Sequence, residues 1–273
     1  MKEHIYEPDP KRDKESYELI GSFPDAPDLP GQVTVAETRD EVLDAVAHDL
    51  VSMALDCVRD FGDFHLALSG GKTPQPLYER LMYDPEYRML PWRRTHLWLV
   101  DERCVPLTHE DSNYRMIAET IVQHADLPKE QVHPVDAESS SAAIEYETQI
   151  RESLEWREKG NDRIDFVLLG MGKDGHTAGL FPHTPALAEK ERWMSFTSCS
   201  DAQPSERVTM TFPLINSARF IAVLITGSAK AAMIQRVASG EESIEELPIQ
   251  GVSPIEGELR WYLDPKACEG FPV

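Results

Sequence analysis

The stretch FHLALSGGKTP, residues 64–74, decides the fold class because an apolar, strand-like run ends there in a glycine turn. The following residues have helical spacing, with Thr73 expected as the helix N-cap and Pro74 as its first residue. A helix N-terminus leaves free N–H donors, and with those of the turn they can hold one phosphate group. An ordinary strand-to-helix turn is the alternative interpretation.

The turn differs from a nucleotide-binding P-loop, which has the form G-x-x-x-x-G-K-[ST]. With Gly71, Lys72 and Thr73 as the end of that motif, the first glycine would stand at position 66, which is Leu66 inside the strand. The extended wrap around two phosphates is therefore missing. The turn predicts a site for a small phosphorylated molecule, and whether Lys72 contacts it stays open.

Outward from this stretch, short apolar runs alternate with longer segments of helical spacing. The strand-like runs are VTVA (33–36), FHLALS (64–69), THLWLV (95–100), DFVLLG (165–170), RVTMT (207–211) and FIAVLIT (220–226). The helix-like segments are residues 41–58, 113–123, 142–156 and 228–238. This alternation predicts an α/β fold with a largely parallel sheet and helices on both faces. The blocks PIQGVSP and ELRWYLDP are expected to close the sheet edge and shape a loop.

The domain organisation follows from composition. Residues 1–31 are rich in Pro, Asp, Glu and Lys, and we expect a poorly ordered or loosely packed extension. No linker and no internal repeat divides the remainder, so residues 32–273 are expected to form a single domain.

The charge balance restricts the partners. There are 48 acidic and 27 basic residues, a formal net charge of −21, which disfavours binding to nucleic acid and to anionic membranes. The four cysteines are far apart in sequence and form no CxxC pair, which is typical of a reducing compartment. The N-terminus lacks a secretory apolar run and no stretch is long enough to span a bilayer, so we expect a cytoplasmic protein.

Chemistry-bearing residues follow directly after the apolar runs. SGGKTP, Asp101-Glu102-Arg103, MGKDGHT (171–177) and GSAK (227–230) each follow one of them. Ligands of open parallel sheets bind outside the carboxyl ends of the strands. The four clusters are therefore expected to converge on one edge of the sheet and to form one site.

His176 is the candidate general base. Glycines surround it, and Asp174 stands two residues earlier, where its carboxylate can bind one ring nitrogen and leave the other free to accept a proton. The alternative for a lone loop histidine is a structural capping role. His65, His133 and the other histidines lack such neighbours and are expected to be structural or solvated.

The remaining charged candidates each have two interpretations. Arg103 offers a planar donor fork for an oxygen-rich substrate, and Asp101 is either a base or the residue that holds Arg103 in place. Lys230 lies in the first turn of a helix, where a cation opposes the helix dipole unless an anion is bound, although a solvated lysine is also common. Arg207 is a second phosphate candidate. The sequence shows no metal-binding pattern and no G-x-S-x-G nucleophile motif.

Five motifs in this order resemble the 6-phosphogluconolactonases of the pentose phosphate pathway. They are LSGGKTP, VDERCVPLTHEDSNYRM, LLGMGKDGHTAGLFP, RVTMTFPLINSA and VLITGSAKA, and the resemblance covers residues 33 to 265. It implies a modified Rossmann-like, sugar-phosphate isomerase-like fold without metal or cofactor, and hydrolysis of 6-phospho-D-glucono-1,5-lactone. Such an enzyme is expected to be a monomer or a small homo-oligomer.

The resemblance also implies roles for individual residues. The catalytic residues would be His176 as general base, its partner Asp174, and Arg103 near the reacting end. The substrate and its phosphate would be held by Ser69, Gly70, Gly71, Thr73, Asp101, Arg207 and Lys230.

Two alternatives stay open. One is a glucosamine-6-phosphate deaminase/isomerase, but that family has a tyrosine where Arg103 stands and a glutamate where Phe181 stands. The other is a non-catalytic sugar-phosphate sensor, which needs the glycine turn but neither His176 nor Arg103.

Overall fold

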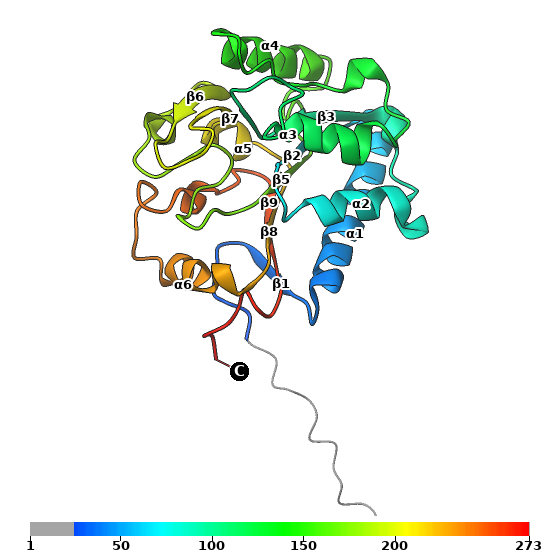
Figure 1. The fold of residues 1–273 in the computed structure, drawn as a ribbon. Helices are drawn as coiled ribbons and strands as arrows, with labels where there is room; N and C mark the ends of the chain where they lie inside the picture. Colours follow the sequence, from blue (N-terminus) through cyan, green and yellow to red (C-terminus); the bar gives the residue numbers. More distant parts are fainter. Residues whose placement is uncertain (1–24, 273) are drawn as a thin grey trace, which may run out of the picture.

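The computed structural model describes residues 25–272. Six parallel strands form the main sheet in the order β1-β9-β8-β5-β2-β3 (Figure 1). Their bounds are β1 Gln32–Val35, β2 Phe64–Leu68, β3 Thr95–Leu99, β5 Phe166–Leu169, β8 Phe220–Ile225 and β9 Glu258–Leu263. Helices α1 and α2 lie on one side of this sheet, whereas α6 and a smaller sheet lie on the other. The predicted α/β class with a parallel sheet and helices on both faces is confirmed.

The smaller sheet has the order β4-β7-β6 and is antiparallel. It consists of β4 Asp101–Arg103, β7 Glu206–Met210 and β6 Met194–Ser198. The run RVTMT thus lies in this sheet as β7 and not in the parallel sheet, and β4 and β6 were not expected. The expectation that ELRWYLDP closes the sheet edge is also wrong, because β9 pairs with β1 on one side and β8 on the other.

The helices follow the predicted segments with shifted ends. They are α1 Arg39–Phe61, α2 Gln75–Tyr83, α3 Asn113–Ile117, α4 Ala142–Leu154, α5 Phe212–Ile215 and α6 Ala231–Ser239, with a π-helical turn at Ala118–Val122 after α3. Helix α1 begins at a capping box, in which Thr38 Oγ1 accepts from Glu41 N–H and the Glu41 carboxylate accepts from Thr38 N–H. It ends at Gly62, whose φ of 93° suits glycine best.

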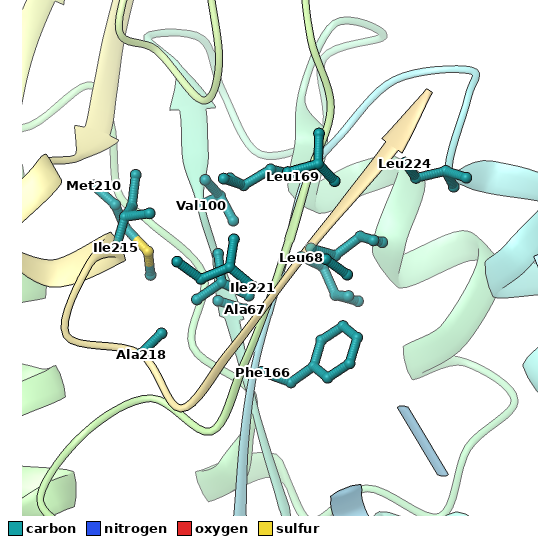
Figure 2. Close-up of a cluster of buried hydrophobic side chains, with 14 of the residues drawn as sticks. Ala67, Leu68, Val100, Phe166, Leu169, Met210, Ile215, Ala218, Ile221 and Leu224 are labelled. Atoms are coloured by element: carbon teal, nitrogen blue, oxygen red, sulfur yellow. The ribbon is translucent and has the colours of Figure 1, made fainter. Parts of the chain in front are cut away.

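The core lies on both faces of the central strands. All residues of β2, β5 and β8 are buried, as expected for strands covered twice. Figure 2 shows how strands of the main sheet pack against residues from β7 and from the segment around α5, with Ala67, Leu68, Val100, Phe166, Leu169, Met210, Ile215, Ala218, Ile221 and Leu224 labelled. Rigid packing of these strands fixes the positions at which their carboxyl ends carry polar loops.

Residues 25–31 precede β1 in the described part of the chain. Residues 1–24 of the predicted extension lie outside the described residues, and its boundary at residue 31 stays a prediction. Leu29 packs in the core and the Pro30 carbonyl accepts from Trp261 Nε1 at 2.7 Å, so packing of the domain includes residues just before Gln32. Within residues 25–272 no helix is both long and apolar enough to cross a membrane.

Candidate active site

A pocket of about 340 Å³ opens at the carboxyl ends of β2, β5 and β8, with β4 and β7 at its side. All predicted site residues except Asp174 line it: Ser69, Gly70, Gly71, Thr73, Asp101, Arg103, His176, Arg207 and Lys230. Lys72 also lies on its wall. The segments that follow four apolar runs in the sequence therefore meet in one cavity, as the strand-end argument predicted.

The glycine turn after β2 is held from both sides. Ser69 Oγ donates to the Leu168 carbonyl of β5 at 2.7 Å, and Tyr78 Oη donates to the Ser69 carbonyl at 2.6 Å. Gly71 has a φ of 100°, which favours glycine. Because Ser69 donates its hydroxyl proton to the Leu168 carbonyl, its side chain ties the glycine turn to β5.

The helix after the turn begins one residue later than expected. Helix α2 starts at Gln75 with Pro74 as its N-cap, and no side chain caps it. The predicted N-cap role of Thr73 is therefore wrong, because Thr73 belongs to the turn that lines the pocket. Among the described residues, the N–H groups of Gly71 and Thr73 donate to no backbone acceptor. These donors are available to an anion in the pocket.

Glu102 fixes the strand that carries Arg103. Its buried carboxylate accepts from the N–H groups of Arg103, Asn113 and Tyr114 at 2.7, 2.7 and 2.8 Å, and from the Ser112 hydroxyl at 2.9 Å. Burial raises the pKa of Glu102, and these hydrogen bonds oppose the increase. Glu102 thus ties β4 to the start of α3.

Arg103 and Arg207 stand opposite each other in the β4–β7 register. Arg207 Nη1 donates to the Glu206 carbonyl at 3.0 Å and to the Pro204 carbonyl. Burial lowers the pKa of Arg207. The negative charge of Asp101 opposes this decrease, whereas the positive charge of Arg103 adds to it. Two adjacent guanidinium groups at the pocket wall favour a bound anion.

Asp101 does not hold Arg103. Its carboxylate accepts from Asn113 Nδ2 at 3.3 Å and lies 3.9 Å from Arg207 Nε. Arg103 is oriented instead by a hydrogen bond from Nη1 to the Asp111 carbonyl. One of the two predicted alternatives for Asp101 is thereby excluded.

His176 and Asp174 form the expected pair. His176 Nδ1 lies 2.6 Å from Asp174 Oδ1, and its ring packs against Phe181 with 4.5 Å between the centroids. Burial raises the pKa of Asp174, but the hydrogen bond and charge of His176 outweigh it, so the pKa lies below its ordinary value. A proton on Nδ1 then points to the carboxylate, and Nε2 is left as an acceptor. A Cβ at Gly172 would lie 2.1 Å from Nδ1, so glycine is required there.

Lys230 completes the cationic wall of the pocket. It ends the short 3-10 turn Ser228–Lys230 before α6, and its Nζ donates to the Met171 carbonyl at 2.6 Å. Burial lowers the pKa of Lys230, although Asp174 opposes the decrease. The half-buried ammonium is directed toward the loop that carries His176.

The structure adds pocket residues that the sequence did not single out. The main ones are Asn113 and Gln203, together with Phe181, which packs against His176. Asn113 lies in the SNYRM motif, just after the Ser112 N-cap, and that helix-start signal could have drawn attention to it. Gln203 stands in the loop between β6 and β7, which carries no local signal.

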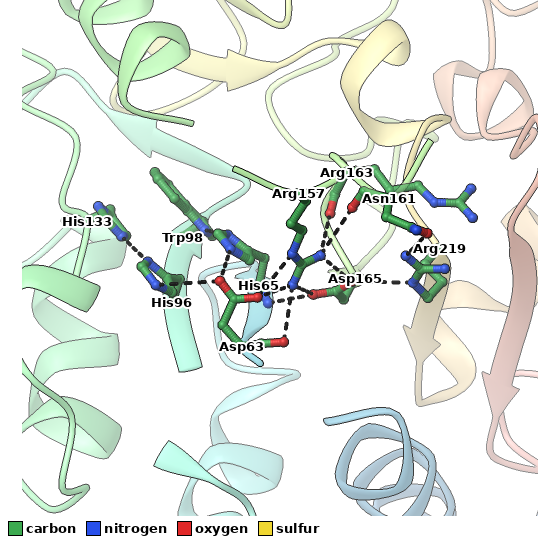
Figure 3. A network of polar contacts seen from close by, with 10 residues as sticks. All are labelled: Asp63, His65, His96, Trp98, His133, Arg157, Asn161, Arg163, Asp165 and Arg219. Atoms are coloured by element: carbon green, nitrogen blue, oxygen red, sulfur yellow. Dashed lines mark hydrogen bonds and ion pairs between the residues drawn. The ribbon is translucent and has the colours of Figure 1, made fainter. Parts of the chain in front are cut away.

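A second polar cluster lies at the opposite ends of the strands (Figure 3). Buried Arg157 binds the Asp63 and Asp165 carboxylates at 2.5 and 2.8 Å, and thereby joins the starts of β2 and β5. His96 Nδ1 lies 3.1 Å from His133 Nε2, and His133 stacks on Trp98. These histidines are structural, as predicted for His65 and His133.

Asp63, His65 and His96 bring three possible metal ligands within 4.8 Å of one another. Trp98 Nε1 donates to His65 Nδ1 at 3.1 Å, so the ring proton is on Nε2, which donates to Asp63 at 3.1 Å. His65 thus offers no free lone pair, and Arg157 already neutralises Asp63. The donor set does not fit a cation.

Comparison with known proteins places this geometry in a family. The family model described as glucosamine-6-phosphate isomerases/6-phosphogluconolactonase matches residues 37–261. The chain is 37% identical over 233 residues to a 6-phosphogluconolactonase of Synechocystis sp., covering 81% of this chain and 94% of that protein. It is 38% identical over 244 residues to the human GDH/6PGL endoplasmic bifunctional protein, covering 86% of this chain but only 30% of that longer protein.

Solved structures of 6-phosphogluconolactonases superpose on this chain. The 6-phosphogluconolactonase of Thermotoga maritima superposes with a TM-score of 0.73 at 29% identity, covering 85% of this chain and 99% of that one. The Trypanosoma cruzi 6-phosphogluconolactonase gives a TM-score of 0.76 at 26% identity, with 91% and 100% coverage. A monomeric glucosamine-6-phosphate deaminase, at 20% identity and a TM-score of 0.72, shares the fold. The chain belongs to the glucosamine-6-phosphate isomerase/6-phosphogluconolactonase family.

Proposed function

We propose that the chain hydrolyses 6-phospho-D-glucono-1,5-lactone to 6-phosphogluconate, a step of the pentose phosphate pathway. The observation that carries the proposal is that His176, paired with Asp174, lines one pocket together with three cations, Arg103, Arg207 and Lys230. A base for water and separate groups for a phosphate are what this substrate requires. The 6-phosphogluconolactonases among the relatives support the same reaction.

In the proposed reaction, His176 Nε2 takes a proton from water while the water oxygen bonds to C1 of the lactone. The carbonyl electrons move to the oxyanion, which Arg103 stabilises. When the carbonyl re-forms, the bond from C1 to the ring oxygen breaks and the imidazolium returns its proton to that leaving oxygen. Asp174, kept ionised by its lowered pKa, stabilises the imidazolium between these steps.

The phosphate end serves as the anchor. Gly71 and Thr73, whose N–H groups donate to no backbone acceptor, line the same cavity as Arg207 and Lys230. We assign the phosphate to these groups, with Gly70 allowing the close approach. Binding energy from this remote group orients the reacting carbonyl against His176.

The deaminase alternative has less support. It would use Asp101 as the base, but that carboxylate is engaged by Asn113 and lies near Arg207. Arg103 and Phe181 also stand where the deaminases have tyrosine and glutamate. A sensor without activity would not need the oriented His176–Asp174 pair.

The cellular setting is part of the proposal. The four cysteines Cys57, Cys104, Cys199 and Cys268 are all free, which supports a reducing compartment such as the cytoplasm. Relatives include proteins named as chloroplastic and as endoplasmic, so compartments differ within the family. We propose a small-molecule partner alone, and a monomer or small homo-oligomer.

The test is acid release from freshly made phosphogluconolactone by the wild type, with ammonia release from glucosamine 6-phosphate measured in parallel. His176→Asn should lower kcat by roughly 10²–10⁴-fold because it removes the base while it keeps polarity. His183→Asn is the matched control: His183 is exposed, and its φ of 58° is one that asparagine tolerates.

Acid release by the wild type and by His183→Asn but not by His176→Asn supports the proposal. Ammonia release in place of acid release refutes it in favour of the deaminase. If both variants hydrolyse the lactone at the wild-type rate, the base assignment is wrong and Asp101 becomes the next candidate.

A further inference from the structure

Asn113 stands where two walls of the pocket meet. It is the first residue of α3, lines the pocket and is only 2% exposed. Its backbone N–H donates to Glu102 Oε1 at 2.7 Å, while the preceding Ser112 hydroxyl donates to Glu102 Oε2 at 2.9 Å. A buried carboxylate thus fixes the backbone from which the Asn113 side chain enters the site.

The orientation of the Asn113 carboxamide follows from its partners. Nδ2 lies 2.8 Å from the Asp101 main-chain carbonyl, which can only accept, so this atom is the nitrogen. It also lies 3.3 Å from the Asp101 carboxylate. The oxygen Oδ1 therefore points away from Asp101 and has no hydrogen-bond partner among residues 25–272. A buried acceptor kept without a partner calls for an explanation.

Oδ1 lies against Gly70 at the wall of the pocket. A Cβ built on Gly70 would lie 1.7 Å from Asn113 Oδ1 and 2.2 Å from its Cγ. The carboxamide occupies the space that any side chain at position 70 would need. Glycine at this position therefore admits Asn113, in addition to leaving room for a ligand.

We propose that Asn113 is a positioning residue of the pocket, whose carboxamide is wedged between Gly70 and Asp101 and sets the spacing between the glycine turn and β4. The turn offers the free N–H groups of Gly71 and Thr73, and Asp101 lies 3.9 Å from Arg207 Nε. Asn113 thereby aligns two sets of anion-binding groups without touching the reacting atoms. The substrate in this inference rests on the proposed function, whereas the test by phosphate binding does not depend on it.

The main variant is Asn113→Leu, which keeps the approximate volume and removes the donor to Asp101. We expect KM for the phosphorylated lactone to rise about 10- to 100-fold, in line with the loss of a hydrogen bond to a charged site, while kcat changes less than about threefold. The kcat/KM for unphosphorylated gluconolactone should stay unchanged. Asn216→Leu is the control. Asn216 lies outside the pocket, where its side chain forms hydrogen bonds with the backbone of Gly251 and Ser253. This control variant should lower the melting temperature without changing KM.

A double-mutant cycle covers the case in which Asn113→Leu does not fold. Gly70→Ala should raise KM strongly in the wild-type background and at least tenfold less in an Asn113→Gly background, because the clashing side chain is gone. Additive effects of Gly70→Ala and Asn113→Gly overturn the proposal. Equal losses on both lactones, or an unchanged KM in Asn113→Leu, overturn it too.

A binding readout separates this inference from the proposed function. Inorganic phosphate should raise the melting temperature of the wild type and of Asn216→Leu, but not that of Asn113→Leu. If the wild type shows this protection yet hydrolyses no lactone, the proposed function fails and the positioning role stands. If phosphate protects Asn113→Leu as well as the wild type, or does not protect the wild type, the positioning role is refuted.

Discussion

Acidification from pH 7 to pH 5 should destabilise the protein through the half-buried histidines His96 and His133. Burial, with neighbouring histidines adding to it, lowers the pKa of His96 to about 4 and that of His133 to about 3. In the unfolded chain an imidazole has a pKa of about 6.5. Between these values the unfolded state binds protons that the native state does not, so stability falls as the pH falls.

The magnitude follows from these pKa values. Each pH unit below about 6.5 costs about 1.4 kcal/mol for each histidine until its native pKa is reached. From pH 7 to pH 5 this amounts to about 2 kcal/mol for each histidine and about 4 kcal/mol for both. That is a large part of a typical unfolding free energy of about 5–15 kcal/mol. Burial raises the pKa of Asp63, but its bonds to His65 and Arg157 outweigh this effect and hold the pKa below its ordinary value. The stability that Asp63 contributes is therefore lost only as the pH falls further.

The assay is urea unfolding followed by circular dichroism at pH 7, 6 and 5. His96→Phe/His133→Phe keeps the rings that stack near Trp98 but cannot titrate, so the pH dependence should shrink by about 4 kcal/mol. His48→Phe is the control, because His48 is 75% exposed and its loss should leave the dependence intact. The same loss of stability between pH 7 and pH 5 in the double variant and the wild type would refute the reasoning.

Four further predictions concern the pocket and the ion pairs. Lys230→Ala and Arg207→Ala should each weaken binding of the phosphorylated lactone by about 1.5–3 kcal/mol and leave unphosphorylated gluconolactone unaffected, as measured by KM; equal losses on both lactones would assign them to the fold. Because burial lowers the pKa of Lys230, phosphate affinity measured by calorimetry should fall with rising pH below the usual lysine range, and Lys230→Arg should abolish that fall. Arg157→Met should lower the unfolding free energy by about 3–5 kcal/mol in urea melts, since it removes the guanidinium from buried Asp63 and leaves Asp165 with Arg219 alone, whereas a loss below about 1 kcal/mol would contradict a buried network. Phosphate or 6-phosphogluconate should protect the protein thermally and ATP should add nothing beyond its charge, so saturable, Mg-dependent ATP binding would restore the P-loop interpretation.

The sequence predicted the edge of the sheet at which the site lies, for a simple physical reason. Runs such as FVLL are apolar at every position only when both faces of a strand are covered, and the polar residues that follow must then emerge at one edge. The His176–Asp174 pair was predictable because its members are two residues apart and the contact is local.

What the sequence did not predict depends on partners that are distant along the chain. The run RVTMT alternates polar and apolar residues, which suits an antiparallel strand, but its pairing with β4 and β6 depends on segments distant along the chain. Strand β9 is inserted between β1 and β8, a topology that local patterns do not encode. The helix-start signal at Ser112 could draw attention to Asn113, but its fit against Gly70 joins two segments distant along the chain and was not predictable.

The pocket and the Arg157 cluster occupy opposite ends of the same strands, and this separation bears on how the protein can change. Loops after β2, β5 and β8 carry the ligand-facing groups, whereas Arg157 ties the starts of β2 and β5 together. A new side chain in such a loop alters ligand choice without exposing or unpairing a buried charge. Libraries that randomise residues 72–73 or 202–203 should therefore yield folded variants with new ligand preferences far more often than libraries at the opposite edge, which makes the carboxyl-end loops the place to evolve new substrates on this scaffold.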